Sequence, residues 1–248
     1  MDSRPLQNRI ALVTGATRGI GQAAALGLAR AGAHVIALGR TQGGLEALDD
    51  QIFADTGAHA TLVPIDLRQP EGLDVLGATI HERWGKLDIL VHAAAVLGGI
   101  TPTGHIEPKK WDETLAVNLT ASWRMIRSME PLLKASDRGR AIFLTSGRVA
   151  RPKAFWAAYA ASKAGMEALV RCWADEVENT TVQAVLLDPS TMRTRMRAEA
   201  YPGEDPLTLP EPSEIAPLVV QLAQADLGPT APTVVFNDWK AAGGKLSA

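Results

Sequence analysis

The chain has 248 residues, of which 46% are hydrophobic, so it can bury a sizeable core and lies at the upper end of what one domain usually holds. Its 25 basic and 27 acidic residues leave a formal net charge of -2, which gives no electrostatic reason to bind nucleic acid or an acidic membrane surface. Cys172 is the single cysteine, which excludes an intrachain disulfide and a cluster of thiolate metal ligands.

No apolar run reaches the roughly 20 residues needed to span a bilayer, and no stretch of signal-peptide length precedes the first expected strand. The five histidines lack the paired spacing of metal ligands, so no metal site is expected. These features predict a cytoplasmic protein without a membrane partner.

Short aliphatic runs alternate with longer stretches of helical spacing, which is typical of βαβ units around a parallel sheet. The expected strands are Arg9–Thr14, His34–Leu38, Ala60–Pro64, Asp88–His92, Ala141–Thr145, Val182–Leu187 and Thr233–Phe236. The expected helices are Gly19–Ala31, Gly43–Thr56, Pro70–Trp84, Pro108–Ala135, Phe155–Glu178 and Pro212–Ala225. Right-handed crossovers then predict a single-domain Rossmann fold over residues 1–248, an α/β fold whose doubly wound, mostly parallel seven-stranded sheet has helices on both faces.

The segment 189–212 differs from the rest of the chain. It is rich in Pro, Thr, Arg and Glu, has no strand pattern and is longer than an ordinary connection. We expect it to form a mobile flap over a substrate site.

The first expected strand runs into Thr14-Gly15-Ala16-Thr17-Arg18-Gly19-Ile20-Gly21, directly before a helix rich in small residues. The missing side chains at Gly15, Gly19 and Gly21 let backbone N–H groups approach a pyrophosphate, and the helix N-terminus favours its negative charge. The motif predicts a dinucleotide site, although a tight turn in any α/β protein gives the same pattern. Its spacing differs from G-x-G-x-x-G and points away from two-domain dehydrogenases.

The end of the second expected strand indicates which dinucleotide binds. An NAD enzyme carries Asp or Glu there for the ribose 2′-hydroxyl, but this chain has Leu38-Gly39-Arg40-Thr41. Arg40 and Arg18 could meet a 2′-phosphate, which favours NADP(H) over NAD(H), or both could simply face solvent. Asp66, after the third strand, could accept the adenine amino group or cap a turn.

A second constellation follows the fifth expected strand. Tyr159 and Lys163 lie one helical turn apart in Tyr159-Ala160-Ala161-Ser162-Lys163, and Ser146 lies at the carboxyl end of a strand, where ligands collect in open α/β sheets. Asn118 stands inside the preceding long helix. Separately, each residue has an ordinary structural explanation: a helix surface, a strand-end turn or a buried polar group.

In this order and spacing, the glycine loop, Asn118, Ser146, Tyr159 and Lys163 resemble the short-chain dehydrogenase/reductase family over nearly the whole chain. The stretches 188–197 and 201–206 are similar to its bacterial YciK-like branch. The resemblance implies that Tyr159 donates a proton to a carbonyl oxygen while Ser146 hydrogen-bonds that oxygen. It also implies that Lys163 holds the nicotinamide ribose and that Asn118 positions a water. The ammonium of Lys163 and the positive nicotinamide of the oxidised cofactor are both expected to lower the pKa of Tyr159.

The implied cofactor contacts extend beyond the glycine loop. They are Gly15, Thr17, Arg18, Gly19, Ile20, Gly21, Arg40, Asp66, Leu67, Ala93, Ala94, Ala95, Tyr159, Lys163, Pro189 and Thr191. Two places depart from the family pattern: His92-Ala93-Ala94-Ala95 stands where the family has Asn-Asn-Ala-Gly, and Pro189-Ser190 stands where it has Pro-Gly. Both departures put cofactor affinity in question.

The expected substrate is a medium-sized carbonyl compound or secondary alcohol, with Leu97, Arg148, Phe155 and Trp156 as contacts. An anionic group on it could meet Arg148 or Lys153, or both side chains could face solvent. The alternatives are a catalytically inactive nucleotide-binding regulatory or scaffold protein of the same fold, and a sugar-nucleotide epimerase. The epimerase is disfavoured because the C-terminal remainder is small.

The resemblance further implies a homodimer or homotetramer. Trp123, Met125, Met129 and Trp173 are candidate subunit contacts, or else members of the core. The absence of the family's C-terminal Asp-Gly-Gly segment makes the tetramer uncertain.

Overall fold

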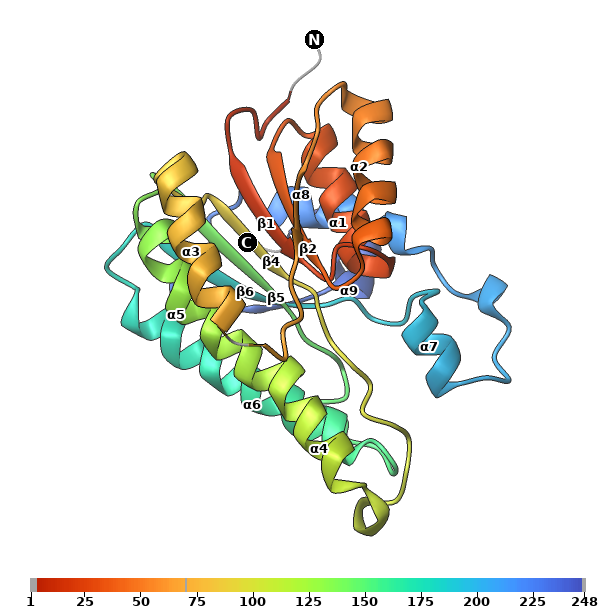
Figure 1. The fold of residues 1–248 in the computed structure, drawn as a ribbon. Helices are drawn as coiled ribbons and strands as arrows, with labels where there is room; N and C mark the ends of the chain where they lie inside the picture. Colours follow the sequence, from red (N-terminus) through yellow and green to blue (C-terminus); the bar gives the residue numbers. More distant parts are fainter. Residues whose placement is uncertain (1–3, 70, 247–248) are drawn as a thin grey trace.

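The structure is a computed structural model that describes residues 4–69 and 71–246. Its seven strands form one sheet in the order β3-β2-β1-β4-β5-β6-β7 (Figure 1). They are β1 (Ile10–Thr14), β2 (His34–Gly39), β3 (Thr61–Pro64), β4 (Ile89–His92), β5 (Gly139–Leu144), β6 (Val182–Asp188) and β7 (Thr233–Val235). The predicted doubly wound sheet is confirmed, and its strand pairs are all parallel.

Helices cover both faces of the sheet (Figure 1). One layer holds α1 (Gly19–Arg30), α2 (Gln42–Thr56), α8 (Ala216–Leu222) and α9 (Phe236–Ala241), and the other holds α3 (Glu71–Trp84), α5 (Ala121–Lys134) and α6 (Ala157–Glu176). Successive side chains of β1 alternate between the two cores, with Ala11 and Val13 in the first and Leu12 in the second. Burial on both faces explains why the strands are apolar throughout.

The long helix expected over Pro108–Ala135 is instead three pieces. A π-helical turn, η2 (Ala116–Thr120), separates α4 (Pro108–Leu115) from α5. A π turn inserts an extra residue into the helical ladder and is common at functional sites. Asn118 lies inside this turn.

Several other ends differ from the expectations. The helix expected from Phe155 begins at Ala157, and the one expected over Pro212–Ala225 is a 3₁₀ turn, η4 (Pro212–Ile215), followed by α8. Phe236 begins α9 rather than ending a strand. Pro70, the expected start of the third helix, lies outside the described residues.

The segment 189–212 is more regular than expected. It contains α7 (Arg195–Ala200) and a 3₁₀ turn, η3 (Pro206–Thr208), and Figure 1 shows α7 standing apart from both helical layers. The guanidinium of Arg197 makes two hydrogen bonds of 2.6 Å to the carboxylate of Glu204. These contacts give the segment its own local structure.

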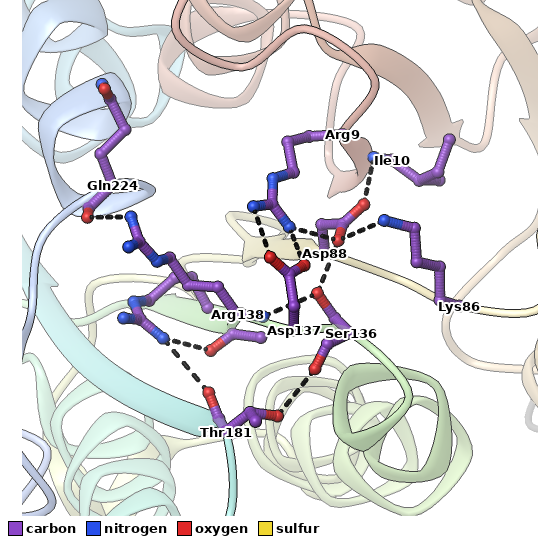
Figure 2. Close-up of polar contacts among 11 residues, drawn as sticks. Arg9, Ile10, Lys86, Asp88, Ser136, Asp137, Arg138, Thr181 and Gln224 are labelled. Carbon is purple, nitrogen blue, oxygen red and sulfur yellow. Dashed lines mark hydrogen bonds and ion pairs between the residues drawn. The ribbon is translucent and has the colours of Figure 1, made fainter.

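A polar cluster lies at the amino ends of β1, β4 and β5 (Figure 2). The fully buried carboxylate of Asp88 accepts hydrogen bonds from the backbone N–H of Ile10 (2.8 Å), Arg9 (3.0 Å), Lys86 (2.9 Å) and Ser136 (2.5 Å). Burial alone raises the pKa of this carboxyl, but these hydrogen bonds together lower it below its usual value. Asp88 therefore ties three strands together as a charged group.

Of the four candidate subunit contacts, Met125, Met129 and Trp173 belong to the core, with exposed fractions of 0%, 0% and 2%. Trp123 is 44% exposed. Three of these residues thus pack inside their own chain.

Among the described residues, no helix is both long and apolar enough to pass through a bilayer.

Candidate active site

The glycine loop joins β1 to α1 beside β4. Gly15 and Gly19 have φ angles of +66° and +57°, which other residues adopt only with strain. A Cβ at Gly15 would lie 2.9 Å from the Cα of Ala94, and one at Gly21 would lie 2.3 Å from the carbonyl oxygen of Gly15. The loop is thus a backbone cradle that side chains would fill, and Arg18 at the start of α1 makes no capping hydrogen bond with its side chain.

A cavity of about 890 Å³ opens from this cradle at the carboxyl ends of the neighbouring strands β1 and β4. Its wall includes Leu97 and every predicted cofactor contact except Thr191. The wall does not include six other predicted residues: Asn118, Ser146, Arg148, Lys153, Phe155 and Trp156.

At one end of the cavity, Arg18 and Arg40 lie in the wall near Gly39. A Cβ at Gly39 would lie 2.6 Å from Cγ2 of Thr17, so the acidic side chain of an NAD enzyme would collide there. The carboxylate of Asp66 also lies in the wall, where it is held by Arg68, whose hydrogen bond lowers the pKa of Asp66. This end combines the guanidinium groups of Arg18 and Arg40 with no carboxylate at position 39.

At the other end, α6 places Tyr159 and Lys163 one turn apart. Both are buried, with exposed fractions of 8% and 2%, and Lys163 donates a 2.6 Å hydrogen bond from Nζ to the carbonyl of Leu144. Ser146 lies two residues beyond the end of β5, and its Oγ accepts a hydrogen bond from the backbone N–H of Arg148 (3.2 Å). β5 ends one residue earlier than expected, and Ser146 lies in the loop that follows it.

The pKa values at this end are shifted by burial. Burial raises the pKa of Tyr159 to about 12, against a hydrogen bond with Ser146 that lowers it, and it lowers the pKa of Lys163 to about 8, against the nearby Glu167. This direction is opposite to the lowering expected from Lys163 and a bound nicotinamide ring, because burial outweighs the hydrogen bond with Ser146 and the charge of Arg148. Tyr159 is therefore a neutral phenol at neutral pH.

Asn118 does not point into the cavity. Its side-chain amide accepts from the N–H of Val96 (2.9 Å) and donates to the carbonyl of Val96 (2.9 Å) and to Oγ of Ser162 (3.0 Å). The π turn thereby fastens the segment after β4 to α6. Through these three hydrogen bonds, the Asn118 side chain holds the segment that contains Val96, a residue of the cavity wall, in place. The water-positioning role expected from the resemblance remains a prediction.

The two departures from the family pattern have different consequences. Ala95 does not have a positive φ, so alanine there is under no left-handed strain. Ser190 has a φ of +58°, which a glycine would adopt freely. Its N–H donates to Asp188 (2.9 Å) and its Oγ accepts from the N–H of Asn237 (3.2 Å), and these bonds stabilise the turn.

Several residues of the cavity wall were not predicted from the sequence, and Thr194 is one of them. Thr194, not the exposed Thr191, lies in the cavity wall, and its Cγ2 would be 3.6 Å from a Cβ at Gly19. Its Oγ1 also accepts a hydrogen bond from the backbone N–H of Arg197 and so caps α7. A threonine directly before a helix is typical of an N-cap, and this is the feature by which the sequence could have indicated Thr194. His92 is 2% exposed, and its Nδ1 lies 3.1 Å from Oγ1 of Thr14, which accepts from the N–H of Ala94.

Aromatic side chains close the space beside Tyr159. Leu97, Trp156 and Tyr159 pack together, and Tyr201 from the segment 189–212 packs against them, with its ring centroid 5.9 Å from that of Trp156. The two cations expected to meet an anionic group of the substrate both contact these aromatic residues. Arg148 lies 5.2 Å from the Trp156 centroid, and Nζ of Lys153 lies 3.5 Å from the hydroxyl of Tyr201.

The chain belongs to the short chain dehydrogenase family, whose sequence pattern it matches over residues 9–205. It is 36% identical to the uncharacterized oxidoreductase YciK of Escherichia coli (strain K12) over 223 residues, which are 89% of this chain and 88% of that protein. This confirms the predicted resemblance to the YciK-like branch.

Two solved structures are similar over most of their length. A short chain dehydrogenase from Shigella flexneri 2a str. 301, complexed with NADP, aligns with a TM-score of 0.90 at 35% identity, covering 94% of this chain and 98% of that one. One from Escherichia coli CFT073, complexed with NADPH, aligns with a TM-score of 0.89 at 35% identity and the same coverage of 94% and 98%.

Proposed function

We propose that this oxidoreductase depends on NADP(H) and interconverts a carbonyl compound and a secondary alcohol. The observation that carries the proposal is the placement of Tyr159 and Lys163 in the wall of the cavity that begins at the glycine cradle. The cradle fits a pyrophosphate because added side chains would fill it. When bound, the cofactor supplies or accepts the hydride.

The roles of the chain's own residues follow from their chemistry. In the reductive direction, Tyr159 donates its proton to the carbonyl oxygen, and the Ser146 hydroxyl hydrogen-bonds that oxygen as negative charge develops on it. The raised pKa of Tyr159 keeps the proton in place at neutral pH. Lys163 holds a ribose hydroxyl, and Asn118 acts through the segment that it fastens.

The preference for NADP(H) rests on Arg18 and Arg40, whose guanidinium groups suit a 2′-phosphate. The complexes of the two similar structures with NADP and NADPH support this proposal. We also propose that residues 1–248 act as one domain, that the segment 189–212 is the substrate flap, and that the enzyme is a cytoplasmic homodimer or homotetramer.

Fluorescence titration with NADPH and NADH tests the cofactor assignment. Arg40→Ala is expected to weaken NADPH binding about 10- to 100-fold and to leave NADH binding nearly unchanged, since only NADPH carries the 2′-phosphate. Arg30→Ala is the control, because Arg30 is exposed and paired with Asp55. Tighter binding of NADH than of NADPH by the wild type would overturn the assignment.

A panel of aldehydes and ketones with NADPH then tests the activity. Reduction of at least one member supports the proposed function. Tight binding of NADPH without turnover of any member would instead support a nucleotide-binding regulatory protein.

A further inference from the structure

One face of α6 carries polar side chains at intervals of one helical turn, at Tyr159, Lys163, Glu167 and Arg171. Residues four apart are neighbours on the surface of a helix. The first two are the phenol and the ammonium of the proposed reaction, and both lie in the cavity wall. The carboxylate of Glu167 and the guanidinium of Arg171 continue the same face beyond the cavity, because neither residue is part of its wall.

The ammonium of Lys163 is buried beside a neutral acceptor. The residue is 2% exposed, and its Nζ donates to the carbonyl of Leu144 (2.6 Å). Burial lowers the pKa of Lys163 to about 8, and the charge of Glu167 opposes this fall. Without its charge, the amine would have two N–H donors instead of three, and Leu144 already engages one of them. A nearby negative charge therefore favours the form of Lys163 that can hold a ribose hydroxyl.

Glu167 also contacts the chain segment that leads to Ser146. Its Oε1 accepts a hydrogen bond from the hydroxyl of Thr145, the buried residue directly before Ser146. The residue before that, Leu144, is the one bound by Lys163. Two successive residues where β5 ends are thus fastened to successive turns of α6. The loop that carries Ser146 is thereby held against the helix that carries the phenol.

Charged groups of α6 and β6 face Glu167 as well. Nη2 of Arg171 lies 3.8 Å from Oε2 of Glu167 and donates a 2.8 Å hydrogen bond to the hydroxyl of Thr233. On β6, burial raises the pKa of Asp188, and the charge of Glu167 adds to this rise. Asp188 thus favours its neutral form more than an ordinary carboxyl does, and Glu167 is the carboxylate whose charge acts on Lys163.

We propose that Glu167 is a positioning residue of this active site, which supplies the counter-charge of Lys163 and, through Thr145, holds the loop of Ser146 against α6. The inference rests on the proposed function, because that function assigns Ser146, Tyr159 and Lys163 to the reaction. Glu167 lies outside the cavity wall, so it acts through these residues and not by touching the substrate.

The variant Glu167→Gln tests the counter-charge, because it removes the charge and keeps an oxygen that accepts from Thr145. NMR titration of protein labelled with ¹³C at Cε of lysine measures the pKa of Lys163, and Lys163→Met identifies its signal. The wild type is expected to titrate at about 8, and Glu167→Gln about one unit lower. Glu176→Gln, at the exposed end of α6, is the control and should leave this pKa unchanged. Equal pKa values in the wild type and Glu167→Gln would overturn the counter-charge.

The variant Thr145→Val tests the hold on the loop, because it removes the hydroxyl and keeps the shape of the side chain. With NADPH and an aldehyde or ketone that the wild type reduces, kcat is expected to fall about 5- to 20-fold and KM to change less than about 2-fold. The loss falls on kcat because Ser146 acts on the oxygen as negative charge develops there. Thr145→Ser restores the hydroxyl and should restore kcat. An unchanged kcat in Thr145→Val, or an equal loss in Thr145→Ser, would overturn this role.

Failure of the proposed function gives a different result. If the wild type reduces no aldehyde or ketone, the proposed function fails, but the NMR titration needs neither cofactor nor substrate and still decides the role of Glu167 toward Lys163. If the wild type is active and the pKa of Lys163 is the same in Glu167→Gln, the inference about Glu167 fails alone.

Discussion

Buried titratable groups have opposite pKa behaviour at the amino and carboxyl ends of the strands. At the amino ends of the strands, Asp88 is fully buried, yet its hydrogen bonds lower its pKa and keep it ionised. At the carboxyl ends, burial prevails: it raises the pKa of Tyr159 to about 12 and lowers that of Lys163 to about 8. The first arrangement stabilises the fold, and the second costs stability and leaves proton-carrying groups available for chemistry.

Asp88→Ala has the largest expected effect on stability. The change leaves Arg9, Lys86, Ser136 and the N–H of Ile10 without their shared acceptor, which costs about 3–5 kcal/mol of unfolding free energy. Urea unfolding measures the loss. Asp137→Ala is the control, because this exposed carboxylate pairs with the same Arg9, and its loss should be much smaller.

The lowered pKa of Asp88 also predicts how the stability of the protein changes in acid. A carboxyl whose pKa is lowered by folding contributes stability above its unfolded pKa, and this contribution is lost as the pH falls through the folded value. Wild-type stability should therefore fall below about pH 4 more steeply than that of Asp88→Asn. If the stability of the two proteins fell in parallel with pH, the account of Asp88 at the amino ends of the strands would be contradicted.

Lys163→Met is expected to stabilise the protein while abolishing activity. Folding lowers the pKa of Lys163 from 10.5 to about 8, so between these values the unfolded chain binds more protons and stability rises with pH. The unfolding free energy of the variant should be about 1–3 kcal/mol higher than that of the wild type at neutral pH. It should not rise further as the pH increases. Lys134→Met, on the surface of α5, should show neither change, and a destabilised Lys163→Met would contradict the comparison.

The phenols offer a smaller effect that absorbance can resolve, because the chain has only two tyrosines. Burial raises the pKa of Tyr159 to about 12, whereas that of Tyr201 is lowered, since Lys153 and other nearby cations outweigh its slight burial. Two separate ionisations are expected, and Tyr159→Phe should remove the later one. Asp188→Asn should lower the later pKa by about half a unit, because the charge of Asp188 opposes the phenolate.

Ser190→Gly is expected to change stability least. Glycine relieves the strain of a positive φ but loses the hydrogen bond that Ser190 accepts from Asn237, so the net change should stay within about 1 kcal/mol. Thermal unfolding measures it. A larger loss of stability would show that the Ser190 hydroxyl stabilises this turn through more than one hydrogen bond.

Local signals in the sequence predicted the sheet and the cradle. Apolar runs indicated the strands. Glycines 15, 19 and 21 indicated the turn after β1, where the backbone at Gly15 and Gly21 packs too closely against other backbone atoms for a side chain. The π turn at Asn118 was not predicted, because an extra residue in a helix leaves the amphipathic pattern nearly unchanged. The helix α7 was missed for a related reason: six residues are too few to show a period.

The electrostatics of the site were the least predictable part. The sequence places Lys163 one turn from Tyr159 and suggests a lowered phenol pKa. The folded chain instead buries Tyr159 under Trp156 and the distant Tyr201, and that burial is decided by tertiary packing. Likewise, Thr194 and Thr191 look alike in sequence, and only the path of the segment shows which one meets the glycine loop.

The most direct test of the central claim is single-turnover reduction of a carbonyl substrate by NADPH in the wild type and in Tyr159→Phe. The account predicts that the variant binds NADPH as the wild type does but transfers the hydride about 10²- to 10⁴-fold more slowly, because the proton donor is gone. A variant with an unchanged single-turnover rate would contradict the assignment of Tyr159 as the proton donor.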